Sequence, residues 1–293
     1  PPPPPPPPPF FYHPHPAIRD SSTSRGLGDV YKRQALLRNS EDGMILAGGQ
    51  TLIPAMKQRL ASPSDLIDLS ADDTLKKIFV KKTKRMGIFE AAGGETVSLG
   101  AMVTHAEISS SNELALVCPE ICNLASNIGD PAVRNRGTIG GSVANNDPAA
   151  DYPAALLAMQ ATIHTNLRKI AASDYFKGMF ATALNDEEII TSISFQVPAF
   201  GNYCKFPNPA SRYAIVGVFI SKSSKDIVRV AVTGAGKNGV FRHLELEAAL
   251  TSDWSVAAID KVDISSENLL SDIHSDPVYR ANLIRVMAKR AIA

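Results

Sequence analysis

The sequence of 293 residues has few cysteines, and neither sign of charge dominates. Three cysteines, a small and odd number, argue against a disulfide framework and favour a reducing cytoplasm. A formal net charge of +1 gives no electrostatic reason to expect nucleic acid or an anionic membrane as a partner. No apolar run reaches the length of a membrane span, and we expect no secretion signal. The length and the 44% hydrophobic content fit a cytoplasmic protein of two modest domains.

Metal ligands at suitable spacing are also lacking. Cys118 and Cys122 lie on a predicted helix, where they can share one face. A zinc site would need further cysteine or histidine ligands close by, and none follow. The pattern therefore predicts buried free thiols and no metal site.

The first part of the chain lacks any pattern of a folded domain. Residues 1–9 are all proline, which allows only a polyproline II rod or disorder. Residues 21–34 show neither helical nor strand periodicity. We therefore expect residues 1–34 to be a low-complexity segment, disordered or artefactual, and we place the start of the fold at residue 35.

From residue 35 the pattern is regular. Residues 44–47 predict a buried strand, 48–51 a tight glycine turn, 52–60 a helix and 66–69 a second strand. This order, strand, glycine loop, helix and strand, is typical of a ligand-cradling arrangement.

The middle of the chain mixes short strands and helices. Thr104 and Glu107 form a capping box that opens a helix, which predicts that His105 is an exposed first-turn residue and not a catalytic base. Further strands are predicted at residues 78–80, 86–88, 96–99 and 162–165, and further helices at 118–127 and 148–159.

A second α+β layer is predicted after residue 198, with strands at 215–220 and 227–232 and helices at 244–250 and 279–292. Between them, Gly234, Gly236 and Gly239 match the GxGxxG pattern of dinucleotide-binding turns. Glu245 and Glu247 follow too closely to be the ribose-binding acid of that motif. We therefore interpret this segment as an ordinary strand-to-strand or strand-to-helix connection.

The most informative segment is residues 134–153. Gly140 and Gly141, flanked by the hydroxyls of Thr138 and Ser142, precede the carboxylates Asp147 and Asp151. A glycine pair lets backbone N–H groups approach a ligand closely, and small hydroxyls add donors without bulk. These are the properties that a phosphate-containing cofactor requires of a loop.

Several motifs along the chain carry a resemblance to a known family. Residues 47–52 read Ala-Gly-Gly-Gln-Thr-Leu, and residues 138–142 read Thr-Ile-Gly-Gly-Ser. With residues 128–137, 173–184, 188–193, 210–217 and 271–280, they resemble the FAD-binding medium subunit of molybdenum hydroxylases of the carbon monoxide dehydrogenase and xanthine dehydrogenase type. The resemblance covers about residues 36–293.

This resemblance implies an α+β fold. It consists of a two-subdomain, PCMH-like FAD-binding domain and a C-terminal α+β domain of the CO dehydrogenase flavoprotein type. The expected boundaries are residues 35–198 for the FAD-binding domain, with subdomains at about 35–80 and 81–198, and residues 199–293 for the C-terminal domain.

The resemblance also implies where FAD binds. Both glycine segments would converge on the pyrophosphate, because a diphosphate carries enough charge to engage N–H groups from two loops. Valine in place of Gly48 or Gly140 is then expected to abolish FAD retention and to leave the chain folded. The expected cofactor-binding residues are Ala47, Gly48, Gly49, Gln50, Thr51, Leu52, Ile128, Gly129, Thr138, Ile139, Gly140, Gly141, Ser142, Asp151, Ile190 and Tyr213.

Some of these residues have an ordinary structural alternative. Asp151 matches a family aspartate that contacts the cofactor, but its charge would also complement the N-terminus of the helix at 148–159. Tyr213, Ile128 and Ile190 match positions near the isoalloxazine ring, and all three would equally suit a core. Many relatives carry a basic residue where this chain has Asn208, which bears on flavin potential and NAD reactivity.

The implied function is electron transfer. A large molybdenum-cofactor subunit would oxidise the substrate, and a small subunit with two-iron–two-sulfur clusters would deliver electrons to this FAD, and onward to NAD or another acceptor. The implied assembly is a dimer of heterotrimers, and no residue of this chain is assigned as a catalytic acid, base or nucleophile. The alternatives are a stand-alone FAD-dependent oxidoreductase and an FAD-free assembly subunit.

Overall fold

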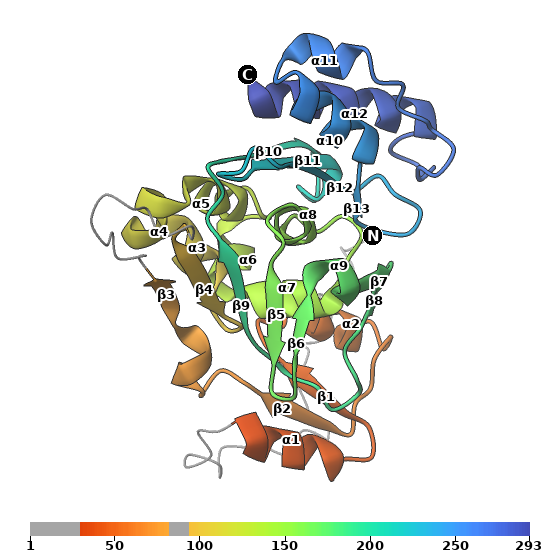
Figure 1. Cartoon of the computed structure of the whole chain (residues 1–293). Helices are drawn as coiled ribbons and strands as arrows, with labels where there is room; N and C mark the ends of the chain where they lie inside the picture. Colours follow the sequence, from red (N-terminus) through yellow and green to blue (C-terminus); the bar gives the residue numbers. More distant parts are fainter. Residues whose placement is uncertain (1–29, 82–93) are drawn as a thin grey trace, which may run out of the picture.

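The N-terminal layer begins with a helix. The computed structural model describes residues 30–81 and 94–293, and helix α1 (Val30–Arg38) packs beside a parallel pair of strands, β1 (Gly43–Leu46) and β2 (Asp65–Asp68) (Figure 1). Helix α2 (Leu52–Lys57) connects the two strands. The fold therefore starts at least five residues before the expected position 35, and residues 1–29 lie outside the described part.

Strand β1 differs from its prediction in burial. The sequence predicted a buried strand here, yet the side chain of Met44 is 37% exposed. A pair of strands has no further neighbours to cover both of its faces, so that the apolar residues of β1 remain half-buried.

A five-stranded antiparallel sheet forms the centre of the molecule, in the order β3-β4-β9-β5-β6. Val97 and Leu99 alternate along β4 and are completely buried on one face, as the period of a strand requires. The strands predicted at 78–80, 96–99 and 162–165 are confirmed, and the one at 86–88 falls outside the described residues. The strands are β3 (Ile78–Lys81), β4 (Thr96–Gly100), β9 (Ile190–Gln196), β5 (Thr162–Thr165) and β6 (Lys169–Ala171).

Short helices cover this sheet, and several begin at recognisable caps. The capping box of Thr104 and Glu107 is present, and Cys118 and Cys122 are buried free thiols, as predicted. The helix predicted at 148–159 is shorter, because Asp147 accepts the N–H of Ala149 and forms a turn first. These elements are α3 (His105–Ser110), α4 (Asn112–Val117), α5 (Pro119–Ser126), α6 (Pro131–Arg136), α7 (Ile139–Asn145), α8 (Tyr152–Ala158) and α9 (Ala172–Tyr175), with a 3₁₀ helix (Asp73–Lys76) and the hairpin of β7 (Phe176–Gly178) and β8 (Ala181–Thr182).

The C-terminal layer is an antiparallel sheet with three helices on its outer face (Figure 1). The GxGxxG segment is the connection between two of its antiparallel strands, which confirms its interpretation as an ordinary turn. The elements are β10 (Phe200–Pro207), β11 (Ala214–Lys222), β12 (Val228–Thr233), β13 (Phe241–Arg242), α10 (Leu244–Ser252), α11 (Val256–Asp260) and α12 (Pro277–Ile292).

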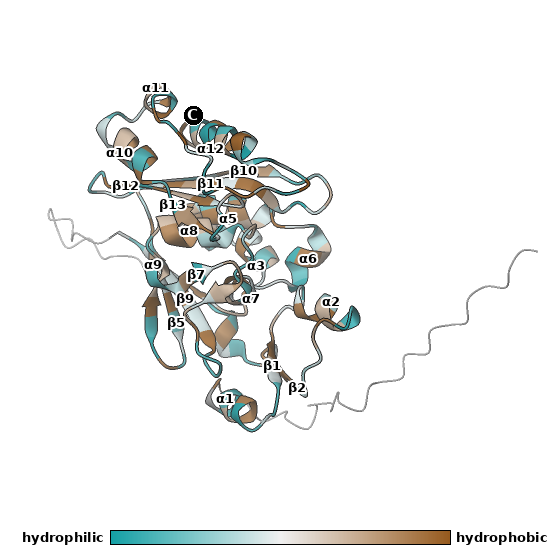
Figure 2. Cartoon of the chain, turned by 90° about the vertical axis from the view of Figure 1, so that its right-hand side faces the viewer, coloured by the Kyte–Doolittle hydropathy of each residue, from teal (hydrophilic) through white to brown (hydrophobic). Residues whose placement is uncertain are grey.

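Strand β11 joins the two layers because both of its faces are buried. Val216, Val218 and Ile220 pack into the core that includes helix α12. Phe219, from the opposite face, belongs to the core of the central layer, together with α8. The apolar colouring of β11 and α8 in Figure 2 follows this arrangement, in which one strand stabilises two cores.

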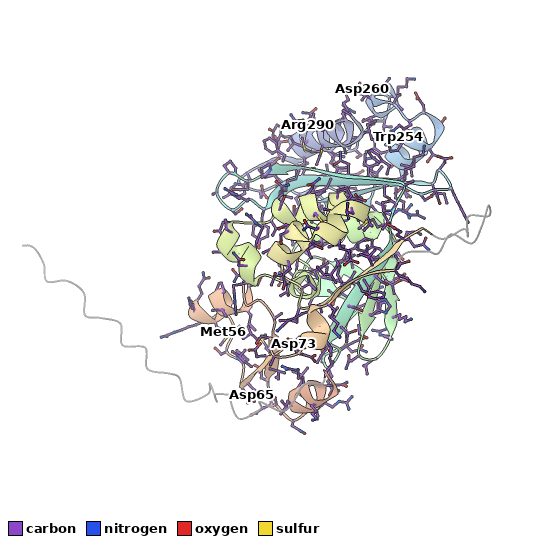
Figure 3. All side chains as sticks on the ribbon, turned by 90° about the vertical axis from the view of Figure 1, so that its left-hand side faces the viewer. Met56, Asp65, Asp73, Trp254, Asp260 and Arg290 are labelled. Carbon is purple, nitrogen blue, oxygen red and sulfur yellow. The ribbon has the colours of Figure 1, made fainter. Side chains whose placement is uncertain are left out.

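The two ends of the molecule carry different parts of the sequence. Trp254, Asp260 and Arg290 lie at the end formed by the C-terminal helices, and Met56 and Asp65 lie towards the opposite end (Figure 3). Within residues 30–81 and 94–293, no helix has both the length and the apolar character needed to cross a membrane.

Candidate functional site

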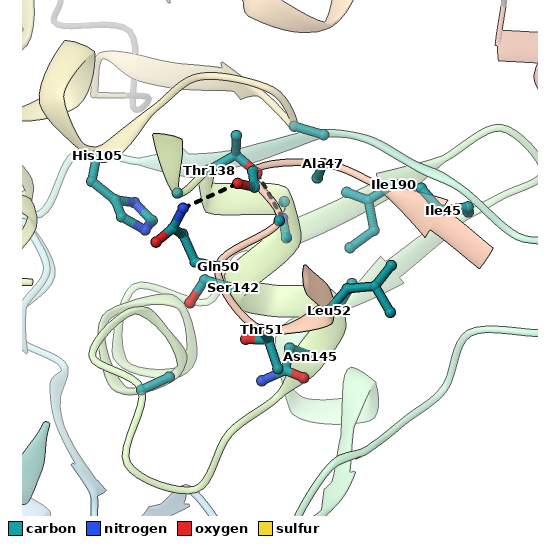
Figure 4. Close-up of a pocket in the computed structure, with 18 of the residues that line it drawn as sticks. Ile45, Ala47, Gln50, Thr51, Leu52, His105, Thr138, Ser142, Asn145 and Ile190 are labelled. Carbon is teal, nitrogen blue, oxygen red and sulfur yellow. Dashed lines mark hydrogen bonds between the residues drawn. The ribbon is translucent and has the colours of Figure 1, made fainter. Parts of the chain in front are cut away.

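A cavity of about 680 Å³ lies where three segments meet: the β1–α2 loop, helix α7 and the β10–β11 turn. Figure 4 shows side chains of the first two segments around it. Its volume is within the usual range for cofactor sites, about 300–1,000 Å³. Its wall contains every predicted cofactor-binding residue except Ile139. Ile139 is completely buried in the central core instead, because it occupies the inner face of α7.

Loop one, which we define as residues 47–52, offers unpaired backbone donors to the cavity. The N–H groups of Gly48, Gly49 and Gln50 make no hydrogen bond within the part of the chain that the structure describes. Gly49 has a φ of +72°, a left-handed conformation that glycine adopts without strain. Successive free N–H groups in such a turn form a concave donor surface suited to an anion.

Loop two, which we define as residues 138–142, looks similar in sequence, but the amides of residues 139–142 are all hydrogen-bonded. The N–H of Ile139 donates to the carbonyl of Val103 at 3.0 Å, and that of Gly140 donates to the carbonyl of Ala101 at 2.9 Å. The N–H of Gly141 donates to Oγ1 of Thr138, the N-cap of α7, and the N–H of Ser142 donates to the carbonyl of Thr138. Loop two therefore contributes side chains and shape to the cavity, because the backbone donors of its glycine pair are already satisfied.

Gly48 and Gly140 have no room for a side chain. A Cβ atom on Gly48 would lie 2.2 Å from the carbonyl oxygen of Arg136, and one on Gly140 would lie 2.6 Å from that of Ala101. Valine at either position would collide with backbone, so we expect such variants to be destabilised as well as to lose FAD. The absence of a side chain at Gly48 allows loop one to approach Gly137, and its absence at Gly140 allows α7 to approach Ala101, which follows β4.

Gly141 and Ser142 are the loop-two residues that face the cavity. A Cβ atom on Gly141 would meet only Oγ1 of Thr138 at 3.0 Å and Cβ of Ala47 at 3.4 Å, between the two loops. The hydroxyl of Ser142 has no hydrogen-bond partner among the described residues. A small ligand group can therefore approach this point and accept a hydrogen bond from the Ser142 hydroxyl.

Asp151 is buried in the cavity wall beside the C-terminal layer. Its Oδ1 accepts the hydroxyl of Tyr203 at 2.5 Å and pairs with Nζ of Lys205 at 2.9 Å. Burial raises the pKa of Asp151, and the Lys205 ammonium and the Tyr203 hydroxyl oppose that rise. Its side chain makes no cap bond to α8, and its contacts with Tyr203 and Lys205 both use Oδ1. Oδ2 is therefore available to accept a ligand hydroxyl.

Tyr213 and the two isoleucines form a more apolar part of the wall. Tyr213 is 47% exposed, which is too open for a core residue, while Ile190 is buried and also belongs to the central core. Ile128 packs against the same core. These side chains suit one face of a planar aromatic ligand, because such a ring loses apolar surface to water on stacking.

The turn that carries Tyr213 is shaped by Asn208. Its side-chain Oδ1 accepts the N–H groups of Ala210 and Ser211, so this residue serves the turn itself. Arg212, which the sequence reading did not single out, lines the cavity with a left-handed φ of +61°. Its guanidinium donates to the carbonyl of Gly129, another residue of the cavity wall.

The exposure of His105 differs clearly from the sequence prediction. It was expected to be exposed, but the side chain is buried and lines the cavity. Its Nδ1 lies 3.1 Å from the hydroxyl of Tyr152, and its backbone N–H donates to the carbonyl of Gly137. Burial, and then the charge of Arg134, lowers its pKa to about 4, so the ring is neutral near pH 7.

The described residues hold no group of three or more His, Cys, Asp or Glu side chains placed to bind a metal ion. The donors that surround the cavity are amides, hydroxyls and a carboxylate oxygen. This set suits an organic ligand with a phosphate and hydroxyl groups better than a metal.

Comparisons with known proteins agree with this donor set. The family described as the FAD binding domain in molybdopterin dehydrogenase matches residues 28–199, more than half of the chain. The chain therefore belongs to this family of FAD-binding oxidoreductase domains, and FAD is its cofactor. The match begins ahead of residue 30, in agreement with the early start of helix α1.

Particular relatives extend this finding over nearly the whole chain. The nicotine 6-hydroxylase medium subunit of Paenarthrobacter nicotinovorans is 33% identical over 94% of this chain and 96% of its own length. A structure of carbon monoxide dehydrogenase from Hydrogenophaga pseudoflava matches with a TM-score of 0.77 and 29% identity, over 90% of this chain and 93% of that one. Quinoline 2-oxidoreductase from Pseudomonas putida 86 matches with the same TM-score, 26% identity and the same coverages. These neighbours confirm the α+β fold expected from the resemblance.

Proposed function

We propose that the chain is the FAD-binding electron-transfer subunit of a molybdenum hydroxylase. It would take electrons from iron–sulfur clusters of a partner subunit and pass them through FAD to NAD or another acceptor. The observation that carries this proposal is the cavity, in which the free N–H groups of loop one face the side chains of loop two. A diphosphate would satisfy donors that the protein leaves without partners.

The residues present fit FAD by chemistry. Gly48, Gly49 and Gln50 would donate to the diphosphate, and the hydroxyl of Ser142 would add a fourth donor. Oδ2 of Asp151 would accept a hydroxyl of the cofactor, and Tyr213 would lie against the flavin ring. When bound, FAD supplies the capacity to accept and release electrons, while the protein binds and orients it.

The wall also limits access of water to the cofactor. Ile128 and Ile190 are apolar, and Ile190 is buried, so the flavin side of the site would be poorly hydrated. A dry environment strengthens the hydrogen bonds that orient the cofactor and protects a reduced flavin from side reactions.

The need for partner subunits follows from the residues that the chain lacks. Two-iron–two-sulfur clusters need four cysteine ligands each, and the sequence holds three cysteines, none of them grouped for this purpose. The related proteins are named medium subunit or medium chain, which places them in complexes with several subunits. We therefore include in the proposal a large molybdenum-cofactor subunit, a small iron–sulfur subunit and a dimer of heterotrimers in a reducing cytoplasm, where free thiols persist.

A hydrogen-exchange experiment tests the cofactor site directly. The purified chain is loaded with FAD, its flavin absorption is recorded, and amide exchange is followed with and without FAD. We expect loop-one amides to become protected only when FAD is bound, because they have no partner in the free chain. The amides of Ile139 and Gly140 serve as an internal control, since they are bonded in both states.

The result also separates the alternatives. A chain that takes up no FAD and shows no change in loop one would favour an FAD-free assembly subunit. Turnover of an organic substrate by the isolated, FAD-loaded chain would favour a stand-alone oxidoreductase. Flavin reduction that occurs only after addition of the reduced iron–sulfur subunit is the result expected for an electron-transfer subunit.

A further inference from the structure

His105 is a polar side chain in the cavity wall to which the proposed function assigns no role. The residue is 4% exposed and lies at the first position of α3. It is held at both ends: its backbone N–H bonds to Gly137, and Nδ1 contacts the hydroxyl of Tyr152. In contrast, Nε2 has no hydrogen-bond partner among the described residues.

The position of Nε2 relates this ring to both glycine loops. A Cβ atom on Gly137 would lie 2.7 Å from Nε2, so the ring rests against the backbone of Gly137. The other neighbour of that backbone is Gly48, whose own Cβ atom would lie 2.8 Å from Cα of Gly137. His105 and the side chain of Gln50 both reach into the space beside this junction (Figure 4). The ring therefore lies beside the junction where Gly48 of loop one meets Gly137, the residue directly before loop two.

The contact with Tyr152 decides which ring nitrogen carries the proton. Tyr152 is completely buried, and its hydroxyl has no other hydrogen-bond partner among the described residues. A buried hydroxyl that kept its proton unpaired would lose about 1–3 kcal/mol. Tyr152 therefore donates to Nδ1, and a neutral ring that accepts at Nδ1 must carry its proton on Nε2.

We propose that His105 binds the cofactor, donating its Nε2–H to a phosphate oxygen at the junction of the two loops. This inference rests on the proposed function, because it names a further donor for the same diphosphate. Tyr152 acts as a positioning residue, since it fixes the tautomer without touching the cofactor. Burial and the charge of Arg134 keep the ring neutral, and thus keep Nδ1 an acceptor, near pH 7.

Two substitutions separate the roles of the ring nitrogens. His105→Asn places an amide near Nδ1, where it can still pair with Tyr152, but it cannot reach the position of Nε2. His105→Gln places an amide near the position of Nε2 and can restore the donor. His164→Asn is the matched control, because His164 bonds to Ser194 in the central sheet and is absent from the cavity wall.

The measurement is a titration of each variant with FAD and, separately, with ADP, which carries the diphosphate but no flavin. We expect His105→Asn to weaken both ligands by about tenfold or more, the loss typical of one hydrogen bond to a charged acceptor. His105→Gln should recover most of this loss, Tyr152→Phe should lose about threefold through a mixed tautomer, and His164→Asn should bind as the wild type does.

Nitrogen-15 NMR of labelled histidine gives a readout on the unmodified protein. In the wild type, Nδ1 of His105 should show the shift of an unprotonated nitrogen, and addition of ADP should move the Nε2 signal. If the His105 ring signals of the wild type do not shift on addition of ADP, the inference is overturned. Unchanged FAD and ADP binding by the His105→Asn variant would overturn it as well. Loss of FAD binding with unchanged ADP binding would also overturn it, because the contact would then lie at the flavin. A wild-type chain that takes up neither ligand would instead reject the proposed function.

Discussion

Loop one and loop two both contain a Gly-Gly pair near small hydroxyl residues, but the two pairs have different structural roles. In loop one, Gly49 adopts a left-handed φ and its amide is free. In loop two, Gly140 donates its amide to Ala101, and its missing side chain makes room for strand β4. Two identical dipeptides in one wall therefore provide a donor surface in one case and a packing contact in the other.

This comparison shows that a glycine motif has to be interpreted with its hydrogen-bond partners. Gly48 and Gly140 allow close approach of backbone to backbone, Gly49 is suited to its left-handed φ, and Gly141 lies where a ligand can approach. The donors that a diphosphate needs are thus concentrated in loop one, and loop two limits the width of the space.

The largest effect is expected from Gly140→Ala. The added Cβ lies 2.6 Å from both Cβ and the carbonyl oxygen of Ala101, so β4 and α7 must move apart. We expect a loss of about 3 kcal/mol in the free energy of unfolding, the upper part of the range for overpacking. Urea unfolding of this variant measures the loss.

Gly141→Ala is the matched control for that substitution. Its Cβ meets only Thr138 Oγ1 and Cβ of Ala47, so stability should change by less than about 1 kcal/mol, helped by the helix propensity of alanine. FAD affinity should fall, since the cavity narrows there. Equal destabilisation by the two alanines would contradict the distinction between a packing glycine and a cavity glycine.

Acidification should lower the stability of the folded chain, because His105 is held neutral in it. The ordinary pKa of histidine is 6.5 and the folded value is about 4, so below pH 6.5 the unfolded chain binds a proton that the folded chain does not. Stability should therefore fall as the pH drops from 6.5 to 4, by roughly 3 kcal/mol in total. The midpoint of thermal unfolding, followed against pH, measures this change.

The contribution of His105 is isolated by His105→Gln, which does not titrate. Carboxylates elsewhere in the chain affect both proteins alike, so the difference between the two pH profiles reports the histidine. Parallel profiles between pH 6.5 and pH 4 would show that the ring is not held neutral in the folded chain.

A smaller difference is expected between the helix caps of the two loops. Thr138 accepts the N–H of Gly141 and caps α7, whereas Thr51 precedes α2 without any side-chain cap bond. Thr138→Ala should cost about 1 kcal/mol of stability, and Thr51→Ala less than about 0.5 kcal/mol. Chemical unfolding of both variants gives the comparison, and a larger loss for Thr51→Ala would reverse it.

The smallest effect is expected from Gln50→Ala. The side chain of Gln50 is exposed, and its Nε2 donates to the carbonyl of Gly48 at 3.3 Å. Loss of this long, solvated bond should change stability by at most about 0.5 kcal/mol. A loss above 1 kcal/mol, by differential scanning calorimetry, would mean that loop one depends on this side chain for its conformation.

The sequence predicted those features that are encoded locally. The strands of the central sheet follow from their alternation, and the capping box of Thr104 and Glu107 follows from residue types three positions apart. The two glycine segments were predicted to converge, and they do line the same cavity. Family membership was carried by several ordered motifs, none of which needs a tertiary contact to be recognised.

The sequence could not predict features that depend on distant partners. The capping box determines where α3 begins, but the burial of His105 depends on Tyr152, 47 residues later. The sequence gives no reason to distinguish Gly140 from Gly141. Their roles differ because only Gly140 packs against Ala101, which follows β4. Helix α8 begins late because Asp147 first closes a turn with Ala149.

The ion pair of Asp151 and Lys205 has a consequence for the biosynthesis of the holoprotein. Asp151 precedes α8, but Lys205 and Tyr203 belong to β10, and Tyr213 follows that strand. A ribosome produces the glycine loops well before these residues, and domains fold in the order of their synthesis. The wall of the cavity is thus complete only after β10 and the turn that follows it have been synthesised.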